Sequence, residues 1–430
     1  MAPTDGPAVR RGVQMSLHPK ERRLSRREFL RRSASGALAV SGAGALLAAC
    51  RERTPATGPG GTTEVPLARP DRPVELPLSE RNPAIADGLS PEAGPLRIFN
   101  WNDYIYKKVL KRFEAEFGVE IEYTQFTGMS EAIAKVQNET VEFDLFFPTI
   151  DHLRDLVLAG RIMPLNHSYL PNVRANAWPA LQDPFYDRGS RYSVPYLTWK
   201  TGIGYRRDMV DVDLAALPMP LDLFWDPAYR GLTGVLDEYR DTIGMVLIRN
   251  GSDPNTEDPA AVERAERDLL AMIDATNVKV AVGDYQALAE GVHALRLSWS
   301  GNMNYARYYL PKGTPVDVLG FYYPPQGGWL VGNDLIVVSS KARNPVLAHA
   351  FIDFLYDRTN ALDNFSYEGY QPPITGVSLE EFRRAGYIPR NLETTLVQES
   401  DFAAGSYVLE LPSEVDQLYQ DAWAAFKAGV

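Results

Sequence analysis

The feature that most constrains the fold is an alternation of short apolar runs with segments of helical period, beginning at Leu96. The apolar runs have the length of strands, and the helical segments repeat apolar residues every three or four positions. The pattern predicts strands at about 96–100, 119–123 and 143–147, and helices at about 106–117, 130–138 and 153–159. This order predicts an α/β fold with a mostly parallel sheet, in which ligands bind at the carboxyl ends of the strands.

A second set of the same kind starts near residue 202. Its expected strands are 234–236, 296–299 and 334–338, and its expected helices are 245–249, 259–275, 345–356 and 413–427. Two α/β sets in one chain predict two lobes with a cleft between them.

The first 49 residues differ from the rest in charge. They carry nine Lys and Arg against three Asp and Glu, whereas the other residues carry 35 against 52. Residues 25–30 (SRREFL) resemble a twin-arginine export signal, and the apolar run 33–49 is short and rich in Gly, Ser and Ala, as in a signal-peptide core. Residues 47–50 (LAAC) resemble a bacterial lipobox. We therefore expect a signal peptide over 1–49 and a lipid on Cys50.

Residues 51–94 show neither helical nor strand period. They are rich in Pro, Gly, Thr and charged residues, a composition that buries too little apolar surface to fold alone. We expect Cys50 and this segment, residues 50–94, to form a disordered tether, with structure beginning near Leu96.

Composition excludes several functions. The net charge is −11 with a single cysteine, which argues against non-specific nucleic-acid binding, disulfides, cysteine-rich zinc sites and iron–sulfur clusters. The sequence contains no G-x-G-x-x-G after a strand, no C-x-x-C-H, no G-x-S-x-G and no H-E-x-x-H. We expect no enzyme and no cofactor, although twin-arginine export is also used by cofactor-loaded oxidoreductases.

Several short segments follow one another along the body. They are FNWNDYI (99–105), FDLFFP (143–148), YSVPYLTWKTGIGYR (192–206), FWDPAYRGLTGVLDEYRDTIGMVL (224–247), LSWSGN (297–302), GGWLVGNDL (327–335) and GYQPP (369–373). In order and spacing, the chain from about 96 to 430 resembles the periplasmic spermidine/putrescine-binding proteins of ABC importers. The resemblance implies a two-lobe binding-protein fold, with lobe one at 95–201 and 332–378, and lobe two at 202–331 and 379–430.

A polyamine is an apolar chain that carries ammonium groups. Its receptor needs aromatic faces, each cation–π contact contributing roughly 0.5–2 kcal/mol, and carboxylates for the charged ends. Trp101 and Tyr104 match the family's aromatic wall after the first strand, and Trp299 follows a strand in the second lobe. The resemblance therefore implies that these three side chains contact the ligand.

Glu238 and Asp241 match two acidic positions of the family's second lobe. They are three residues apart at the start of a helix, so both can face one side. Acidic residues are also favoured there as helix caps, which is the alternative role. Asp237 and Arg240 can pair with them and reduce the free charge.

The sequence departs from the family at two places. Val331-Gly332-Asn333 stands where the family has Trp-Met-Asp, so Asn333 keeps the shape of the acid without its charge, and Asp334 is expected to face the opposite side of its strand. Asp151 stands where the family has an aromatic residue. It can replace the missing carboxylate or cap the helix at 153–159.

These features predict a lipid-anchored, extracytoplasmic or periplasmic solute-binding protein that captures a polyamine for the membrane subunits of an ABC importer. We expect a monomer that meets the membrane only through its lipid. One alternative is the same fold binding a neutral or anionic solute through arginines, and another is Fe(III) bound by paired tyrosines. The residues in question are Arg240, Arg296, Arg307, Tyr308, Tyr309, Tyr322 and Tyr323.

The export signal and the lipobox generate a direct prediction. The mature chain should begin at Cys50 and carry a lipid there, because cleavage precedes the only cysteine. Mass spectrometry of the exported protein measures both properties. An unmodified chain that starts upstream of Cys50 would contradict the prediction.

Overall fold

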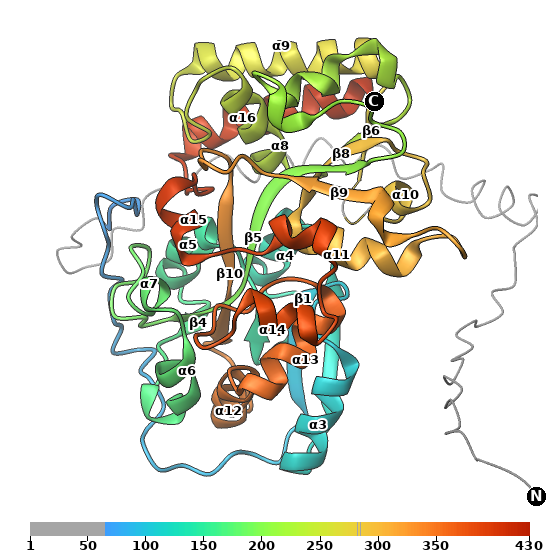
Figure 1. Cartoon of the computed structure of the whole chain (residues 1–430). Helices are drawn as coiled ribbons and strands as arrows, with labels where there is room; N and C mark the ends of the chain where they lie inside the picture. The colour runs from blue at the N-terminus through green and yellow to red at the C-terminus, as the bar shows by residue number, and fades with distance from the viewer. Residues whose placement is uncertain (1–64, 282, 284) are drawn as a thin grey trace, which may run out of the picture. The chain divides into compact units, whose positions relative to one another are not determined.

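The computed structural model describes residues 65–281, 283 and 285–430, and its architecture is α/β, as expected. The expectation of a mostly parallel sheet is wrong, because the strands at 193–206 and 331–339 run antiparallel to every strand that they pair with. The export signal, Cys50 and the first part of the expected tether lie outside the described residues. Figure 1 shows the order of the elements in the described chain.

The strands of the described chain belong to one open sheet. They are β1 (Leu96–Trp101), β2 (Ile121–Phe126), β3 (Leu145–Phe146), β4 (Ile162–Met163), β5 (Ser193–Arg206), β6 (Thr233–Val235), β7 (Lys279–Val280), β8 (Leu295–Trp299), β9 (Leu319–Tyr322) and β10 (Val331–Ser339). The order across the sheet is β2-β1-β3-β10-β5-β8-β6-β7, with β4 paired to β10 and β9 paired to β5.

Helices connect and cover these strands. The α-helices are α3 (Lys107–Phe117), α4 (Met129–Gln137), α5 (Leu153–Leu158), α6 (Pro171–Asn176), α7 (Pro179–Gln182), α8 (Tyr239–Arg249), α9 (Pro259–Thr276), α10 (Tyr285–Ala289), α11 (Ser300–Ala306), α12 (Pro345–Leu355), α13 (Arg358–Glu368), α14 (Leu379–Arg384), α15 (Glu399–Ala404) and α16 (Ser413–Gly429). Short 3-10 helices are η1 (Ile150–His152), η2 (His167–Tyr169), η3 (Leu214–Ala216), η4 (Pro220–Trp225), η5 (Pro227–Tyr229), η6 (Arg307–Tyr309), η7 (Val316–Val318) and η8 (Arg390–Thr395).

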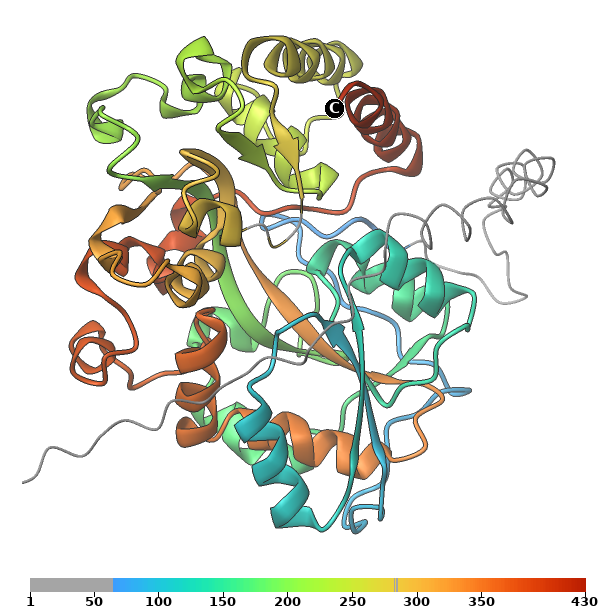
Figure 2. The ribbon, with the colours of Figure 1, turned by 90° about the vertical axis from the view of Figure 1, so that its right-hand side faces the viewer.

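Two long antiparallel strands, β5 and β10, join the two halves of the sheet (Figures 1 and 2). The first part of β5 pairs with β10 as far as Lys200, which lies opposite Val331. From Thr201 onward, β5 pairs instead with β8 and β9. We call the half with β1–β4 the first lobe, and the half with β6–β9 the second lobe. Because β5 leads from one to the other and β10 leads back, the lobes are tied through two adjacent backbones.

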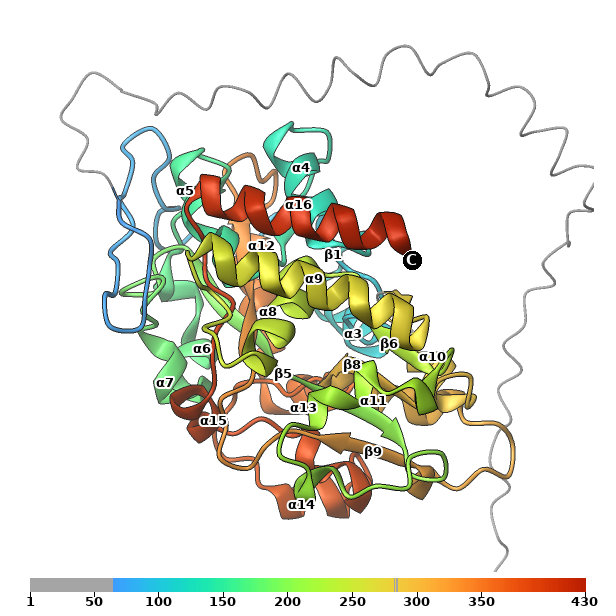
Figure 3. The ribbon, with the colours of Figure 1, turned by 90° about the horizontal axis from the view of Figure 1, so that it is seen from above.

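The second lobe is covered by a pair of long helices. In α9, Asp258 caps the start by accepting a hydrogen bond from Ala260 N, and the apolar residues Ala265, Leu269 and Met272 are buried. Helix α16 lies beside α9, as Figures 1 and 3 show. The last helix of the chain is therefore packed on the second lobe.

Helix α14 packs on α13, where the rings of Phe382 and Phe365 lie with centroids 4.5 Å apart. Helix α13 contacts both lobes, through the ion pair Arg112–Asp363 with α3 and through its neighbour Gly369, whose carbonyl accepts a hydrogen bond from Asn304 of α11 at 3.1 Å. The division of the lobes at residue 379 therefore stays a prediction.

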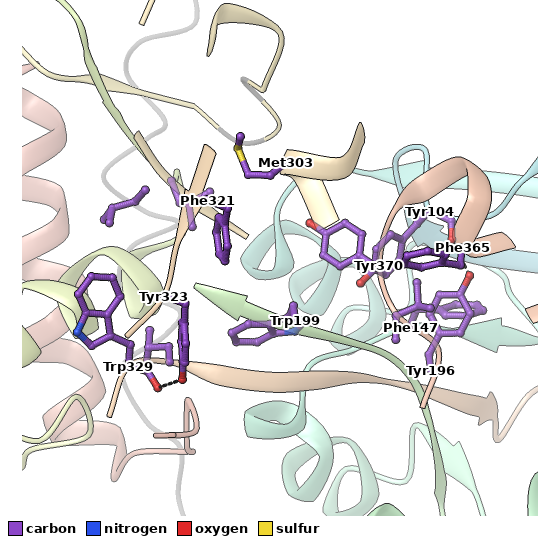
Figure 4. Close-up of a cluster of buried hydrophobic side chains, with 14 of the residues drawn as sticks. Tyr104, Phe147, Tyr196, Trp199, Met303, Phe321, Tyr323, Trp329, Phe365 and Tyr370 are labelled. Carbon is purple, nitrogen blue, oxygen red and sulfur yellow. Dashed lines mark hydrogen bonds between the residues drawn. The ribbon is translucent and has the colours of Figure 1, made fainter. Parts of the chain in front are cut away.

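A cluster of buried aromatic side chains surrounds the crossing strands (Figure 4). Tyr104, Tyr196 and Tyr370 lie together at one end of the view, whereas Tyr323 and Trp329 lie at the other, where Tyr323 OH donates to Trp329 O at 3.0 Å. The crossing is thus held by packed rings rather than by backbone pairing alone.

Residues 65–94 correct the expected boundary near Leu96. The backbone of this segment bonds to the first lobe, with Val74 N donating to Phe185 O at 2.8 Å and Arg191 Nη1 to Leu76 O at 3.0 Å. Val74 and Leu76 are buried in the core of the first lobe. The expectation of a disordered tether is wrong for this part, because two apolar side chains and a row of backbone hydrogen bonds are enough to fix a segment that could not fold alone.

The burial of Leu76 leads to a stability prediction. Leu76 is fully buried at 0% exposure, whereas Leu78 in the same segment is 61% exposed. Leu76→Ala should lower the free energy of unfolding by roughly 2–5 kcal/mol, because it leaves a cavity in the first lobe. Urea unfolding of both variants measures the difference, with Leu78→Ala as the matched control. Equal losses in the two variants would show that the segment is not part of the folded core.

Candidate functional site

One cavity of about 220 Å³ lies between the two lobes. Its wall is made by the carboxyl ends of β1 and β8, the start of α8 and the crossing strands. All seven residues predicted from the sequence line it: Trp101, Tyr104, Asp151, Glu238, Asp241, Trp299 and Asn333. The structure therefore brings the predicted set together, and their contact with a ligand stays a prediction.

Two tryptophans from different lobes meet at this cavity. Trp101 is the last residue of β1 and Trp299 the last residue of β8, and their rings approach edge to face with centroids 6.2 Å apart. Trp299 Nε1 donates to Asp241 Oδ1 at 2.9 Å, whereas Trp101 Nε1 is buried without a hydrogen-bond partner in the described chain. The indoles form an aromatic wall that draws on both lobes.

Asp241 lies in the first turn of α8. Its carboxylate accepts hydrogen bonds from Trp299 Nε1 and from Thr201 Oγ1, the latter at 2.7 Å. Burial raises the pKa of Asp241 to about 6, against the effect of these two hydrogen bonds, and the charge of Asp151 adds to the increase. Asp241 is thus held in a fixed orientation by one residue of β5 and one of β8.

Glu238 occupies the N-cap position of α8, but its side chain caps no backbone group of that helix. Its Oε1 instead accepts a hydrogen bond from Met129 N, at the start of α4 in the first lobe, at 3.3 Å. Burial, and then the charge of Asp241, raise the pKa of Glu238 to about 8. The capping role considered for Glu238 is therefore wrong.

Asp151 lies in η1 and caps neither η1 nor α5. Its Oδ2 lies 3.6 Å from His152 Nε2, and its Oδ1 is buried without a hydrogen-bond partner in the described residues. The capping role considered for Asp151 is also wrong, and one of its oxygens is available in the cavity wall.

Asp334 corrects the expectation that it faces away from Asn333. Both residues line the cavity, because the register between β10 and β5 shifts between Asn333 and Leu335 and breaks the strict alternation of faces. Asp334 accepts hydrogen bonds from Tyr104 OH at 2.6 Å and Trp199 Nε1 at 3.2 Å. Burial raises its pKa to about 7. The carboxylate that Asn333 lacks is therefore supplied by its neighbour.

Asn333 itself is used inside the protein. Its Nδ2 donates to the hydroxyl of Tyr186 at 3.0 Å and to Asp334 O at 3.3 Å. The sequence signal for the irregular strand is Gly332, since an isolated glycine in a strand often marks a bulge or a close approach. A Cβ atom added at Gly332 would lie 2.6 Å from the ring of Trp199 and would collide with it.

Sequence reasoning missed other residues of the wall. Those with ionisable, amide or aromatic side chains include Asp103, His152, Trp199, Tyr285, Asn302, Tyr305, Asp334, Glu368 and Tyr370. Most belong to loops or short helices without a periodic pattern. For Tyr370, the available signal is the segment GYQPP, which carries part of the family resemblance.

The charges around the cavity are unbalanced. The carboxyl groups that line it belong to Asp103, Asp151, Glu238, Asp241, Asp334 and Glu368. Arg240 also belongs to the wall, but its guanidinium donates to Leu409 O and Asn255 Oδ1, both at 2.8 Å, and lies over the ring of Tyr419. Asp237 is paired with Lys427 at 2.6 Å rather than with its acidic neighbours. The expected direct pairing of Asp237 and Arg240 with Glu238 and Asp241 is therefore wrong, although the charge of Arg240 lowers the pKa of Asp241.

Apart from Arg240, the groups considered for other ligands lie outside the cavity wall. Arg296 and Arg307 do not line the cavity, and neither do the paired tyrosines considered for Fe(III). Tyr308 is exposed, and Tyr323 is buried against Trp329. Among the described residues, no group of three or more His, Cys, Asp or Glu side chains is arranged to hold a metal ion.

Within the same part of the chain, no helix has the length and apolar character needed to cross a bilayer.

Two proteins of known name have sequences similar to this chain. The putrescine/cadaverine-binding protein of Pseudomonas aeruginosa is 30% identical over 273 residues, which cover 63% of this chain and 76% of that protein. The spermidine/putrescine-binding periplasmic protein of Escherichia coli is 28% identical over 299 residues, covering 67% and 82%.

Solved structures confirm the fold. A putative spermidine/putrescine ABC transporter protein from Listeria monocytogenes has a TM-score of 0.65 at 24% identity, covering 77% of this chain and 98% of that one. A lipoprotein of Treponema pallidum has a TM-score of 0.66 at 21% identity, with the same coverage. The family model described as bacterial extracellular solute-binding protein matches residues 108–386. Since this match spans more than half of the chain, the protein belongs to the bacterial extracellular solute-binding proteins.

Proposed function

We propose that this solute-binding protein captures a polyamine in the cavity between its lobes and delivers it to the membrane subunits of an ABC importer. The observation that carries the proposal is the excess of carboxyl groups over basic groups in the cavity wall, where Arg240 is bonded to groups outside the wall and His152 lies beside Asp151. Such carboxyl groups destabilise one another until a cation enters. The names of the similar proteins point to the same ligand class.

The wall suits both parts of a polyamine. The indoles of Trp101 and Trp299 offer faces and edges to a methylene chain and to its ammonium groups. Glu238 and Asp241 offer carboxylates at one end of α8, with Asp151 close enough to influence the pKa of both. A neutral solute would leave these acids without partners, and an anion would be repelled.

Closure of the lobes is the mechanism that we infer for capture. The hydrogen bond from Met129 N to Glu238, and the contact between Trp101 and Trp299, both join the first lobe to the second. Opening at the crossing strands would break these contacts and admit the ligand, as in hinge motions around a cleft. A cation that replaces them with charge-assisted hydrogen bonds would favour the closed form.

The proposal includes the position of the protein in the cell. A lipid on Cys50 would anchor the chain to the membrane as a monomer facing the periplasm or the cell exterior. The support is the order of export signal and lipobox in residues 25–50.

A thermal-shift panel tests the ligand class. Putrescine, spermidine, spermine, amino acids and Fe(III) are compared with buffer, because a ligand that binds only the folded state stabilises it by about 2.7 kcal/mol at a hundredfold excess over Kd. We expect stabilisation by polyamines. Stabilisation by amino acids or Fe(III) alone would overturn the proposal.

The division of roles between aromatic and acidic residues leads to a prediction for two variants. Trp101→Ala should weaken binding of the selected amine by roughly 1–3 kcal/mol through lost apolar area and cation–π attraction. Glu238→Gln should weaken it by roughly 2–5 kcal/mol, because it leaves a buried ammonium group without its carboxylate. Isothermal titration calorimetry measures both effects.

Two matched controls distinguish binding from folding. Trp423→Ala changes a tryptophan of α16 outside the cavity, and Glu263→Gln changes an exposed glutamate of α9. Neither should alter affinity. If Trp101→Ala and Glu238→Gln also lower only the melting temperature, these residues do not belong to the binding site.

The raised pKa values predict that binding depends on pH. In the free protein the pKa values are about 8 for Glu238, 7 for Asp334 and 6 for Asp241. A bound ammonium favours the ionised forms and lowers these values, so binding should release protons and affinity should rise from pH 6 to pH 8. Each pH unit should add up to about tenfold for every carboxyl group that must ionise.

Calorimetry in two buffers of different ionisation enthalpy measures the protons released near pH 7. Glu238→Gln should reduce that number, since it removes the group whose pKa is raised most among these three. Proton uptake on binding would contradict the prediction that bound amine ionises these carboxyl groups.

The same pKa shifts affect the stability of the protein without ligand. These groups stabilise the folded state most below pH 4, and this contribution is lost as the pH rises through 8.

A further inference from the structure

Glu368 is a buried acid of the cavity wall. The sequence does not predict it, and it has no part in the aromatic wall formed by Trp101 and Trp299. It is the last residue of α13, just before Gly369, and its exposure is only 2%. It lines the same cavity as Glu238 and Asp241, but from a helix joined to the first lobe.

One oxygen of this carboxyl group is used and the other is not. Glu368 Oε2 accepts a hydrogen bond from Tyr370 N at 2.6 Å. Its Oε1 is buried without a hydrogen-bond partner in the described chain. Burial raises the pKa of Glu368 well above its ordinary value, because the charged form is disfavoured away from water.

Two tyrosine rings and an asparagine amide line the same part of the cavity wall as this acid. The ring of Tyr370, two residues along the chain, meets that of Tyr104 edge to face at 5.1 Å, and Figure 4 shows the two rings together. Tyr370 OH donates to Asn302 Oδ1 at 2.9 Å, which fixes the ring. The surroundings of Glu368 thus resemble those of the acids near Trp101 and Trp299, with aromatic faces beside a carboxyl group.

The acids of the cavity wall come from different elements, since Glu238 and Asp241 lie at the start of α8 and Glu368 at the end of α13. Glu238, Asp241 and Asp151 form one group, since the charge of Asp151 raises the pKa values of both others. For Glu368 the cause is burial, opposed only by the hydrogen bond from Tyr370. A ligand with one ammonium group can meet one of these regions, whereas a ligand with two groups on a chain of suitable length can meet both.

We propose that Glu368 is a specificity-determining residue that binds the second ammonium group of a two-ended amine through its unpaired oxygen, and so selects the ligand by length. This inference rests on the proposed function, because it requires that the ligand be an amine. A bound ammonium group favours the ionised form of Glu368, whose unpaired oxygen then accepts a charge-assisted hydrogen bond from it.

A series of α,ω-diamines from three to eight methylenes, with 1-aminobutane as a single-ended probe, tests the inference on the full-length protein. Calorimetry should show that affinity passes through a maximum at one chain length. Glu368→Gln keeps the oxygen that accepts from Tyr370 N, and should lower affinity for the best diamine at least tenfold while changing affinity for 1-aminobutane less than twofold. Glu238→Gln should weaken both.

Glu368→Asp provides a second readout, because it retracts the carboxylate by one methylene group. The preferred diamine should then become one methylene longer, a change that a purely structural role would not produce. Glu116→Gln, at an exposed glutamate of α3, is the matched control and should leave the whole series unchanged. Thermal unfolding of each variant confirms that it is folded.

The outcomes separate the two proposals. If the natural protein binds diamines but neither Glu368 variant alters the length profile, the role of Glu368 is overturned and the proposed function stands. If the natural protein binds no amine in the series and none in the polyamine panel, both are overturned.

Discussion

The candidate site depends on one electrostatic constraint, the burial of several carboxyl groups around a cavity in whose described wall the basic side chains are Arg240, which is bonded elsewhere, and His152, which lies beside Asp151. Burying a charge without a partner is costly, so the groups hold protons instead, as the raised pKa values of Glu238 and Asp334 indicate. The cavity is therefore arranged for a charge that the chain itself does not provide. This arrangement gives selectivity, since a solute that brings no positive charge cannot ionise these groups.

The crossing strands connect this constraint to the fold. Thr201 of β5 orients Asp241, and Trp199 of the same strand orients Asp334 of β10. Next to them, the buried Lys200 donates to Leu396 O and pairs with Asp401 at 3.2 Å, which fixes the segment before α15 to β5. The strands that join the lobes thus also carry the residues that orient the acids, so the proposed closure would move these acids together with the crossing strands.

Periodicity and strand ends are the features that the sequence predicts well. The helices α3, α9 and α16 and the strand ends at Trp101 and Trp299 lie close to the expected positions, because regular apolar patterns decide burial. Asp334 could not be placed, since a shift in strand register depends on how β5 and β10 pack, with Gly332 beneath Trp199. The fixed structure of residues 65–94 could not be predicted for a similar reason, because it depends on hydrogen-bond partners such as Phe185 and Arg191, which lie far along the chain.

The buried carboxyl groups of this chain differ in how completely their oxygens are hydrogen-bonded. Asp187 is fully buried, and burial raises its pKa to about 6, yet it accepts hydrogen bonds from the backbone of Arg191, Tyr192 and Ser193 and from the Ser193 hydroxyl. These bonds use both oxygens to fix the turn before β5. Glu368 is also buried but has one oxygen unpaired, and Asp151 shares that property. A fully bonded acid would lose partners on meeting a cation, whereas an acid with an unpaired buried oxygen can only gain one. Glu368 and Asp151 can therefore gain a partner without losing one, whereas Asp334, whose two oxygens each accept a hydrogen bond, meets a cation with its orientation already fixed.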